Sequence, residues 1–353
     1  MKNTLYFLSF LLSFFYVSCN KDKNAFEQSP SERTAENLRT LRSELTDAPY
    51  GWRVMYFPNT DSLLFSDKNQ IIEKMGDYRS LYGFGGFYFL MKFDQNGTVE
   101  MLSDKDQTAL ATSQKSQFEV NQSTLTELSF TTYNYLQDLV NDQFKGKNDF
   151  LYVRKDFSGN LLFKTNSSIE PARNFIVFQK LTNATQWNGE NNQKNDITLA
   201  YENRKFFEEM QNPQLVIKKG SRIFFKSDVF IKTNSPLESY QKFLQEIKEK
   251  RYYLFRFNKK RNEDPNIYQP EESTGLGSGY VGTEKGITFH AGLRYDSTYI
   301  FYDFQRVGNK FVCELVKVYD PIRKRYYYES KHLFPDGEPT FFTAEITDEP
   351  KPF

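Results

Sequence analysis

The chain is poor in the residues that most metal and nucleophilic chemistry requires. Its 353 residues include only two cysteines, Cys19 and Cys313, and two histidines, His290 and His332. The histidines lie far apart in the chain, without the His-Glu-x-x-His spacing of a zinc site. We therefore expect no metal site and no cofactor.

Motifs for catalysis are also missing. The chain contains no G-x-S-x-G element, P-loop or dinucleotide-binding glycine pattern in context. The glycines between 275 and 282 lack the Lys-Ser/Thr ending of a phosphate loop, so we expect a flexible loop there. These absences predict a non-enzyme without catalytic residues. A hydrolase remains an alternative, because its paired carboxylates would come from distant strands and leave no local pattern.

Charge of one sign is not in excess. The 46 basic and 45 acidic residues nearly cancel, so no long-range field favours nucleic acid, and no nucleic-acid partner is expected. Two stretches, 248–261 and 323–331, mix basic and aromatic residues. Alternating strands with one solvated face explain both stretches most simply. Contact with anionic lipid or polysaccharide is the alternative.

The N-terminus carries an export signal. Lys2 precedes an apolar run, Leu5–Val17, which is too short to span a bilayer comfortably. Ser18 and Cys19 follow, and a cysteine directly after the cleavage position is typical of bacterial lipoproteins. We predict removal of residues 1–18 and attachment of lipid, such as palmitate, to Cys19. The alternatives are ordinary cleavage or a plain anchor, and Tyr16 stands where such signals usually have leucine.

Aromatic residues make up 17% of the chain, which favours strands because flat rings pack well on a pleated sheet. A capped helix is predicted from Ser29-Pro30-Ser31-Glu32 to Ala48. Asp94-Gln95-Asn96-Gly97 predicts a hairpin turn between two strands. The pattern indicates a β-dominated α+β fold with antiparallel meander sheets and a few short helices. The sheets either remain open or curl into a barrel.

Two β-rich parts are expected, separated by a polar segment. The predicted organisation is a signal peptide (1–18), a tether (19–28), an N-terminal domain (29–181), a polar linker loop (182–198) and a C-terminal domain (199–353). Ser235-Pro236-Leu237-Glu238 repeats the helix start of the first part, so two related halves or chance recurrence are open alternatives. The proline-rich tail, 334–353, is predicted to be mostly irregular.

The two tryptophans lie in different settings. Trp52 belongs to a dense apolar segment and is expected in the core. Trp187 lies in the most polar loop, without periodic apolar partners. It is therefore the candidate ligand-binding residue, stacking on a sugar or protein. The alternative is that it packs back onto the sheet.

A series of short segments between residues 26 and 135 carries a family resemblance. The segments are Phe26 with Ser29-Pro30-Ser31-Glu32-Arg33, Gly51-Trp52 to Pro58, Gly85-Gly86-Phe87-Tyr88, Met91-Lys92-Phe93, Asn96-Gly97-Thr98-Val99, Ser103-Asp104, and Ser129-Phe130-Thr131-Thr132-Tyr133-Asn134. Through them the stretch 26–135 resembles an uncharacterised family of surface lipoproteins from Bacteroidota-type bacteria. It implies an outer-membrane lipoprotein on the cell surface, beside SusC- and SusD-like nutrient importers. It implies no catalytic residues. In this chain Asp22 is the lone acidic residue directly after Cys19, where such surface proteins often carry several.

Together these observations predict a lipid-anchored, non-enzymatic protein that captures or hands over a glycan or peptide beside a TonB-dependent importer. Its expected partners are the membrane, through its N-terminal lipid, and SusC/SusD-like proteins. A structural or adhesion module of the cell surface is the second hypothesis, and the carboxylate-dependent hydrolase is the third.

Overall fold

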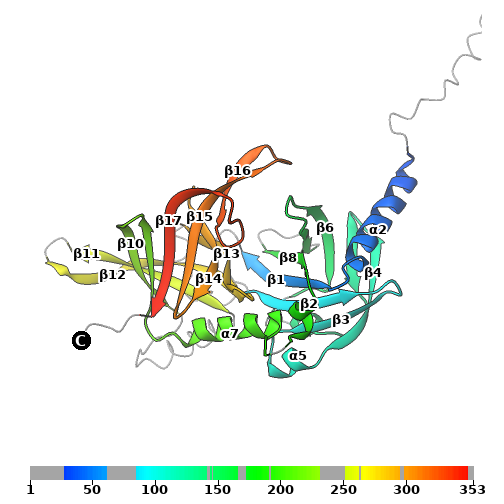
Figure 1. The fold of residues 1–353 in the computed structure, drawn as a ribbon, viewed down its shortest axis with the longest axis horizontal. Coiled ribbons are helices and arrows are strands. Elements are labelled where there is room, and N and C mark those ends of the chain that lie inside the picture. The colour runs from blue at the N-terminus through cyan, green and yellow to red at the C-terminus, as the bar shows by residue number, and fades with distance from the viewer. Residues whose placement is uncertain are drawn as a thin grey trace, which may run out of the picture.

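A computed structural model describes residues 28–61, 85–140, 144, 146–165, 172–190, 192–230, 251–261, 264–294 and 298–348. Cys19 and the second predicted helix, from Ser235, lie outside these residues. The described chain forms two β lobes side by side (Figure 1). We call them the barrel lobe, built from β1 to β8, and the second lobe, built from β9 to β17.

The barrel lobe is a closed antiparallel meander. Its strands are β1 (Trp52–Asp61), β2 (Phe87–Phe93), β3 (Thr98–Ser103), β4 (Gln114–Gln122), β5 (Thr126–Phe130), β6 (Asp149–Lys155), β7 (Leu161–Thr165) and β8 (Ala172–Lys180). Each strand pairs with its neighbour in sequence, and β1 also pairs with β8 to close the ring. The predicted β-dominated antiparallel fold is confirmed, and in this lobe it takes the barrel form.

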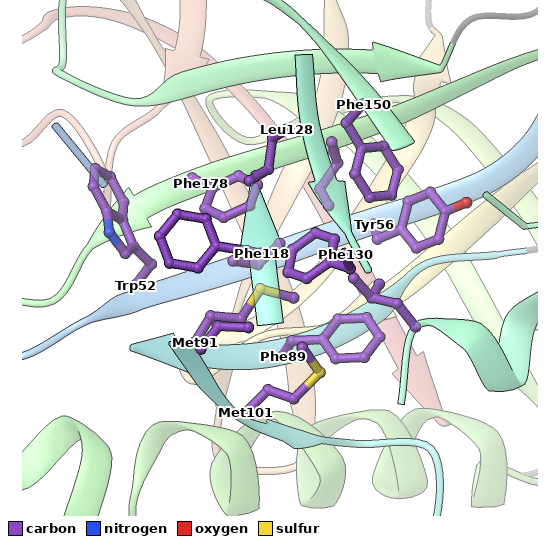
Figure 2. Close-up of a cluster of buried hydrophobic side chains, with 14 of the residues drawn as sticks. Trp52, Tyr56, Phe89, Met91, Met101, Phe118, Leu128, Phe130, Phe150 and Phe178 are labelled. Carbon is purple, nitrogen blue, oxygen red and sulfur yellow. The ribbon is translucent and has the colours of Figure 1, made fainter. Parts of the chain in front are cut away.

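Alternating residues fill the barrel. Trp52, Val54 and Tyr56 on β1 are fully buried and belong to the barrel core. Figure 2 shows Trp52 and Tyr56 within this cluster of buried hydrophobic side chains. Phe93 and Phe118 meet edge-on with ring centroids 4.8 Å apart. Side chains thus occupy the barrel interior, and Trp52 is a core residue as predicted.

Helix α2 (Pro30–Thr46) packs against the barrel core. Its N-terminus has the predicted capping box, in which Ser29 accepts from the Glu32 amide and the Glu32 carboxylate accepts from the Ser29 amide. Leu41 and Leu45 join the barrel core, and the Trp52 indole donates to the Leu45 carbonyl at 2.9 Å. The apolar stripe predicted for this helix therefore helps to cover the barrel core.

The second lobe is a nine-stranded antiparallel sheet with the order β14-β13-β12-β11-β10-β9-β17-β15-β16 and an additional β14–β15 pairing. Its strands are β9 (Pro213–Lys219), β10 (Arg222–Phe230), β11 (Tyr252–Arg261), β12 (Asp264–Gly282), β13 (Gly286–Arg294), β14 (Ile300–Val307), β15 (Lys310–Asp320), β16 (Arg325–Ser330) and β17 (Glu338–Asp348).

Three local predictions were wrong. The tail predicted as irregular contains β17, which pairs with β9 and β15 on either side, because Ala344 and Ile346 supply an alternating apolar face. The glycine run predicted as a loop lies in β12. The predicted linker loop, 182–198, contains the short helix α6 (Thr185–Asn188) and the first turn of α7 (Asp196–Glu209). Asn195 begins α7 by accepting from the Thr198 amide.

Two further short helices occur in the described part of the chain: α5 (Gln107–Ala111) and a 3₁₀ turn (Gln137–Leu139), where a short helix was predicted at 135–140. The predicted hairpin at Asp94–Gly97 is confirmed, with Gly97 at φ 86° joining β2 to β3. This positive φ is the conformation that favours glycine.

Strand β2 is apolar on both faces for a structural reason. Phe89 and Met91 point into the barrel core, whereas Tyr88 and Leu90 point outward. The outward residues form an interlobe cluster with residues of α7 and β12; its members are Phe57, Tyr88, Leu90, Leu102, Leu181, Ile197, Ala200 and Val281. A continuous apolar run is expected for a strand covered on both sides.

Candidate functional site: a cleft between the lobes

Two buried ion-pair networks cross from one lobe to the other. In the first, Arg53 of β1 pairs with Asp196 of α7 at 3.0 Å and with Glu284, in the β12–β13 turn. The Tyr88 hydroxyl lies 3.2 Å from the same Glu284 carboxylate and donates to it. Burial raises the pKa of Asp196 to about 6 despite the opposing effect of Arg53. This network joins the barrel wall to the start of α7.

The second network is centred on Asp104, which follows β3. Arg251 donates to both carboxylate oxygens of Asp104 at 2.9 Å, and Arg204 of α7 approaches Asp104 at 3.3 Å and Glu208 at 2.8 Å. Burial alone would raise the pKa of Glu208, but Arg204, together with Arg251 and Lys205, more than offsets it and the pKa is lowered. Breaking a buried ion pair is strongly destabilising, so these contacts hold the lobes in one arrangement.

A cleft of about 470 Å³ lies between the lobes fixed in this way. The barrel lobe contributes residues of β1, β8 and the β6–β7 turn, and the second lobe contributes residues of β13, β14, β16 and the turn after β16. The lining residues are Met55, Phe57, Asp156, Phe157, Ser158, Asn160, Val177, Gln179, Thr288, Phe289, His290, Tyr302, Asp303, Glu329, Leu333 and Phe334. This volume is typical of small-ligand sites, which often lie at domain interfaces.

Aromatic rings from both lobes line the cleft. Phe157 of the β6–β7 turn and Phe334 of the second lobe have ring centroids 5.8 Å apart. Phe57 of β1 and His290 of β13 lie 4.9 Å apart. The apolar ring faces therefore come from segments far apart in sequence, which only the association of the lobes brings together.

Three carboxylates also line the cleft. Asp303 of β14 accepts a 2.6 Å hydrogen bond from Thr288, its register partner on β13. Burial raises the pKa of Asp303 despite this bond. The pKa of Glu329 is raised to about 7, mainly because the carboxyl is buried and also because the carboxylates of Asp303 and Asp156 lie nearby. Glu329 therefore changes its protonation state near neutral pH. No Lys or Arg is among the residues that line the cleft.

The histidines and the second cysteine do not form a nucleophilic centre. Burial lowers the pKa of His290 to about 4, so its ring is neutral at pH 7. Ser330 lies 2.8 Å from Nδ1 of His332, but its hydroxyl donates to the Asp303 carbonyl and the residue is 3% exposed. Cys313 is buried behind Ser330, and burial raises the pKa of its thiol. Among the described residues no three His, Cys, Asp or Glu side chains, the cleft carboxylates included, are grouped so that they could hold a metal ion.

Trp187, the residue predicted to bind ligand, does not line this cleft. It lies in α6, partly buried, and packs against the interlobe cluster. This placement agrees with the alternative given in the sequence analysis, in which Trp187 packs back onto the sheet. Stacking of Trp187 on a ligand stays a prediction. Cys19, the predicted lipid attachment point, lies outside the described residues.

A larger cavity, of about 750 Å³, adjoins α5 and α7, but its charged side chains already have partners. Arg204 and Arg251 bind Asp104, Lys105 binds Asp138, and Lys205 lies 3.5 Å from Glu208. A third cavity, of about 490 Å³ beside α2, is lined by surface ion pairs. The interlobe cleft differs from both because its carboxylates face no lining cation.

The cleft residues were missed at the sequence level. Glu329 lies in the stretch 323–331, for which the sequence predicted a strand with a charged face or, as the alternative, contact with anionic lipid or polysaccharide, but not a cleft. Asp303 lies between Tyr302 and Phe304, in the first half of a strand whose residues 300–304 are otherwise apolar and aromatic. A carboxylate inside such a strand is the one available signal, because isolated buried charges are costly and cluster at functional sites.

Fold and site together define a two-lobed β protein with a ligand-sized cleft between its lobes. Among the described helices, none has the length and hydropathy needed to cross a bilayer. The chain belongs to the family described as Domain of unknown function (DUF4302), whose model matches residues 22–307. The match covers the barrel lobe, α7 and the second lobe through β14. No curated protein and no solved structure matches the chain.

Proposed function

We propose that this protein captures a ligand in the interlobe cleft and presents it to an importer, without catalysing a reaction. The observation that carries this proposal is the cleft itself, in which aromatic rings and carboxylates from both lobes converge. The buried ion networks favour a preorganised site, because rigid lobes lose little conformational freedom when a ligand binds.

The chemistry of the lining restricts the ligand class. Asp156, Asp303 and Glu329 would repel an anion, and the lining supplies no Lys or Arg to neutralise one. Ring faces such as Phe157 can cover the apolar face of a sugar or a side chain, and Ser158 and Asn160 can hydrogen-bond hydroxyl or amide groups. The proposed ligand is therefore an uncharged or cationic glycan or peptide.

Localisation forms the second part of the proposal. Cys19 carries lipid, holds the protein on the outer membrane at the cell surface, and brings the cleft close to a SusC/SusD-like, TonB-dependent importer. The signal at residues 1–19 and the resemblance of residues 26–135 support this assignment. The family match supports membership of an uncharacterised family and adds no partner.

Ligand capture is tested by screening the mature chain on glycan and peptide arrays. The double variant Phe157→Ala/Phe334→Ala removes rings from both walls of the cleft, and Phe341→Ala removes a ring that is 66% exposed elsewhere on the second lobe. We expect the double variant to lose at least tenfold in affinity and Phe341→Ala to bind as the wild type does. Equal binding by both variants would contradict the assignment of the cleft.

Anchoring and partnership are tested in the native membrane. Cys19→Ser should abolish palmitate labelling, and a high-salt wash should then release the protein from the outer-membrane fraction. Tagged wild-type protein should co-purify with a TonB-dependent importer. If it co-purifies with surface proteins but no array ligand binds, a structural or adhesion role replaces ligand capture.

One observation favours a second candidate function, a carboxylate-dependent hydrolase. A group with a pKa of about 7, such as Glu329, can act as a general acid at neutral pH, and Asp303 or Asp156 could supply the second carboxylate. Incubating array ligands with wild type and Glu329→Gln separates the two functions. Product release that Glu329→Gln abolishes would establish hydrolysis, whereas bound, intact ligand supports capture.

A further inference from the structure

The β15–β16 hairpin projects from the second lobe as a narrow arm (Figure 1). Its two strands are paired from Leu315 opposite Ser330 to Asp320 opposite Arg325. Residues 321–324 form the tip. The Asp320 carboxylate is turned inward: it accepts from the amides of Ile322 and Arg323 at 2.8 and 3.0 Å, and Asp320 is 4% exposed. The one acidic residue near the tip is thus used to shape the turn.

Large apolar and aromatic side chains cover this arm without a partner surface. Ile322, at the tip, is 66% exposed, and Tyr326 and Tyr319 are 57% and 49% exposed. The two tyrosine rings lie 5.1 Å apart on neighbouring strands. Exposed apolar residues on this scale, gathered in one projecting element, indicate an interaction site.

Three adjacent cations, Arg323, Lys324 and Arg325, accompany these side chains at the tip. All three are exposed, and none makes an ion pair within the part of the chain that the structure describes. Arg323 and Arg325 both donate to the Tyr327 hydroxyl, which holds them on one side of the arm. The tip thus combines an apolar end, tyrosines and unpaired positive charge.

The direction in which the arm projects indicates the surface that it contacts. Helix α2 and the β15–β16 hairpin project toward the same side of the molecule, the top of Figure 1. In the sequence, Cys19 lies shortly before Pro30, the first residue of α2. The predicted tether, residues 19–28, can span at most about 35 Å when extended. A lipid on Cys19 would therefore hold a bilayer close to the start of α2, a helix that projects to the same side as the arm.

We propose that the β15–β16 hairpin is a second membrane contact, which rests on anionic headgroups while Ile322 and the tyrosines enter the interfacial region. The choice of a bilayer as the partner rests on the proposed anchoring at Cys19. A basic patch beside a lipid anchor is a common additional membrane signal. Tyrosines favour the interfacial region, and each cation near an anionic surface strengthens binding about fivefold.

The test uses the mature chain with Cys19→Ser, so that no lipid contributes to binding. Its partition onto phosphatidylcholine vesicles is compared with partition onto vesicles that also contain phosphatidylglycerol. We expect binding to the anionic vesicles alone, and we expect this binding to weaken as salt screens the charges. Substituting Arg323, Lys324 and Arg325 together by glutamine should reduce the partition coefficient about 100-fold.

The matched control removes the same charge elsewhere. Lys92, Lys115 and Lys164 are exposed on barrel strands, and their triple substitution by glutamine should leave binding within about twofold of wild type. Ile322→Ser should weaken binding without changing net charge. Thermal unfolding of every variant checks that the fold is retained.

Equal loss in the hairpin and control triples would overturn the proposal, as would equal binding of the wild type to neutral and anionic vesicles. Binding to heparin but to neither vesicle would assign the arm to a dissolved polyanion and also overturn it. Phe157→Ala/Phe334→Ala should keep full vesicle binding, so failure of the cleft and failure of the arm are distinguishable.

Discussion

Replacing Glu329 by glutamine tests the electrostatics of the cleft directly. The substitution keeps the size and shape of the side chain and removes its ionisation. In the native fold the Glu329 carboxyl is partly buried beside Asp303 and Asp156, and its pKa is raised from 4.5 to about 7. The charged form is therefore disfavoured by the folded protein relative to the unfolded chain, and the variant should be more stable than the wild type wherever Glu329 is ionised.

The magnitude follows from linkage. A group with a raised pKa binds more protons when folded, so its stabilising contribution is present below pH 4.5 and is lost as pH rises toward about 7. The full shift corresponds to about 3 kcal/mol. Because Glu329 is only partly buried, solvent screens part of this effect. We therefore expect Glu329→Gln to raise the free energy of unfolding by about 1–3 kcal/mol at pH 8. Near pH 4.5 the two proteins should be almost equally stable.

Denaturant unfolding at pH 4.5, 6, 7 and 8 measures this difference. The stability of wild type relative to Glu329→Gln should fall between pH 4.5 and 8. Glu338→Gln is the control, because Glu338 has a 68% exposed side chain in a surface ion pair with Lys317, and its effect should stay within about 1 kcal/mol at each pH. A Glu329→Gln variant that is less stable than wild type at pH 8 would refute the electrostatic description of the cleft.

Three further substitutions test the fold. Phe130→Ala opens a cavity in the aromatic barrel core and should cost about 3–5 kcal/mol of unfolding free energy, whereas the exposed Phe341→Ala should cost about 0.5 kcal/mol or less in the same urea titration. Asp104→Asn leaves the buried Arg251 without its carboxylate, so calorimetry should show a loss of about 3–5 kcal/mol. Ser29→Ala removes the cap of α2 and should cost about 0.5–2 kcal/mol by thermal denaturation followed by circular dichroism.

Much of the local structure was predictable because local chemistry determines it. The capping box at Ser29 and the Asn-Gly turn at Gly97 are encoded in a few adjacent residues, and both occur as predicted. The tail was mispredicted because its prolines obscured a strand whose partners, β9 and β15, precede it in the chain. Pairing between distant strands depends on surfaces that no local window contains.

The cleft could not be predicted for the same reason. Asp156 and Phe157 come from a barrel turn, and Asp303 and Glu329 come from two strands of the other lobe. Each residue alone is an ordinary turn or strand residue. Only the interlobe contacts, which include a buried arginine at position 53 and an aspartate at position 196, bring them to one place.

The two-sided burial of β2 has a consequence for biosynthesis. The ribosome completes the barrel strands, ending at Lys180, before it makes Val281, which covers Tyr88 and Leu90 on the outside of the barrel. Domains generally fold from the N-terminus as they emerge, and exposed apolar surface makes intermediates prone to aggregate. A barrel lobe that folds first therefore exposes an apolar outer wall, and this wall stays open to aggregation until the second lobe covers it.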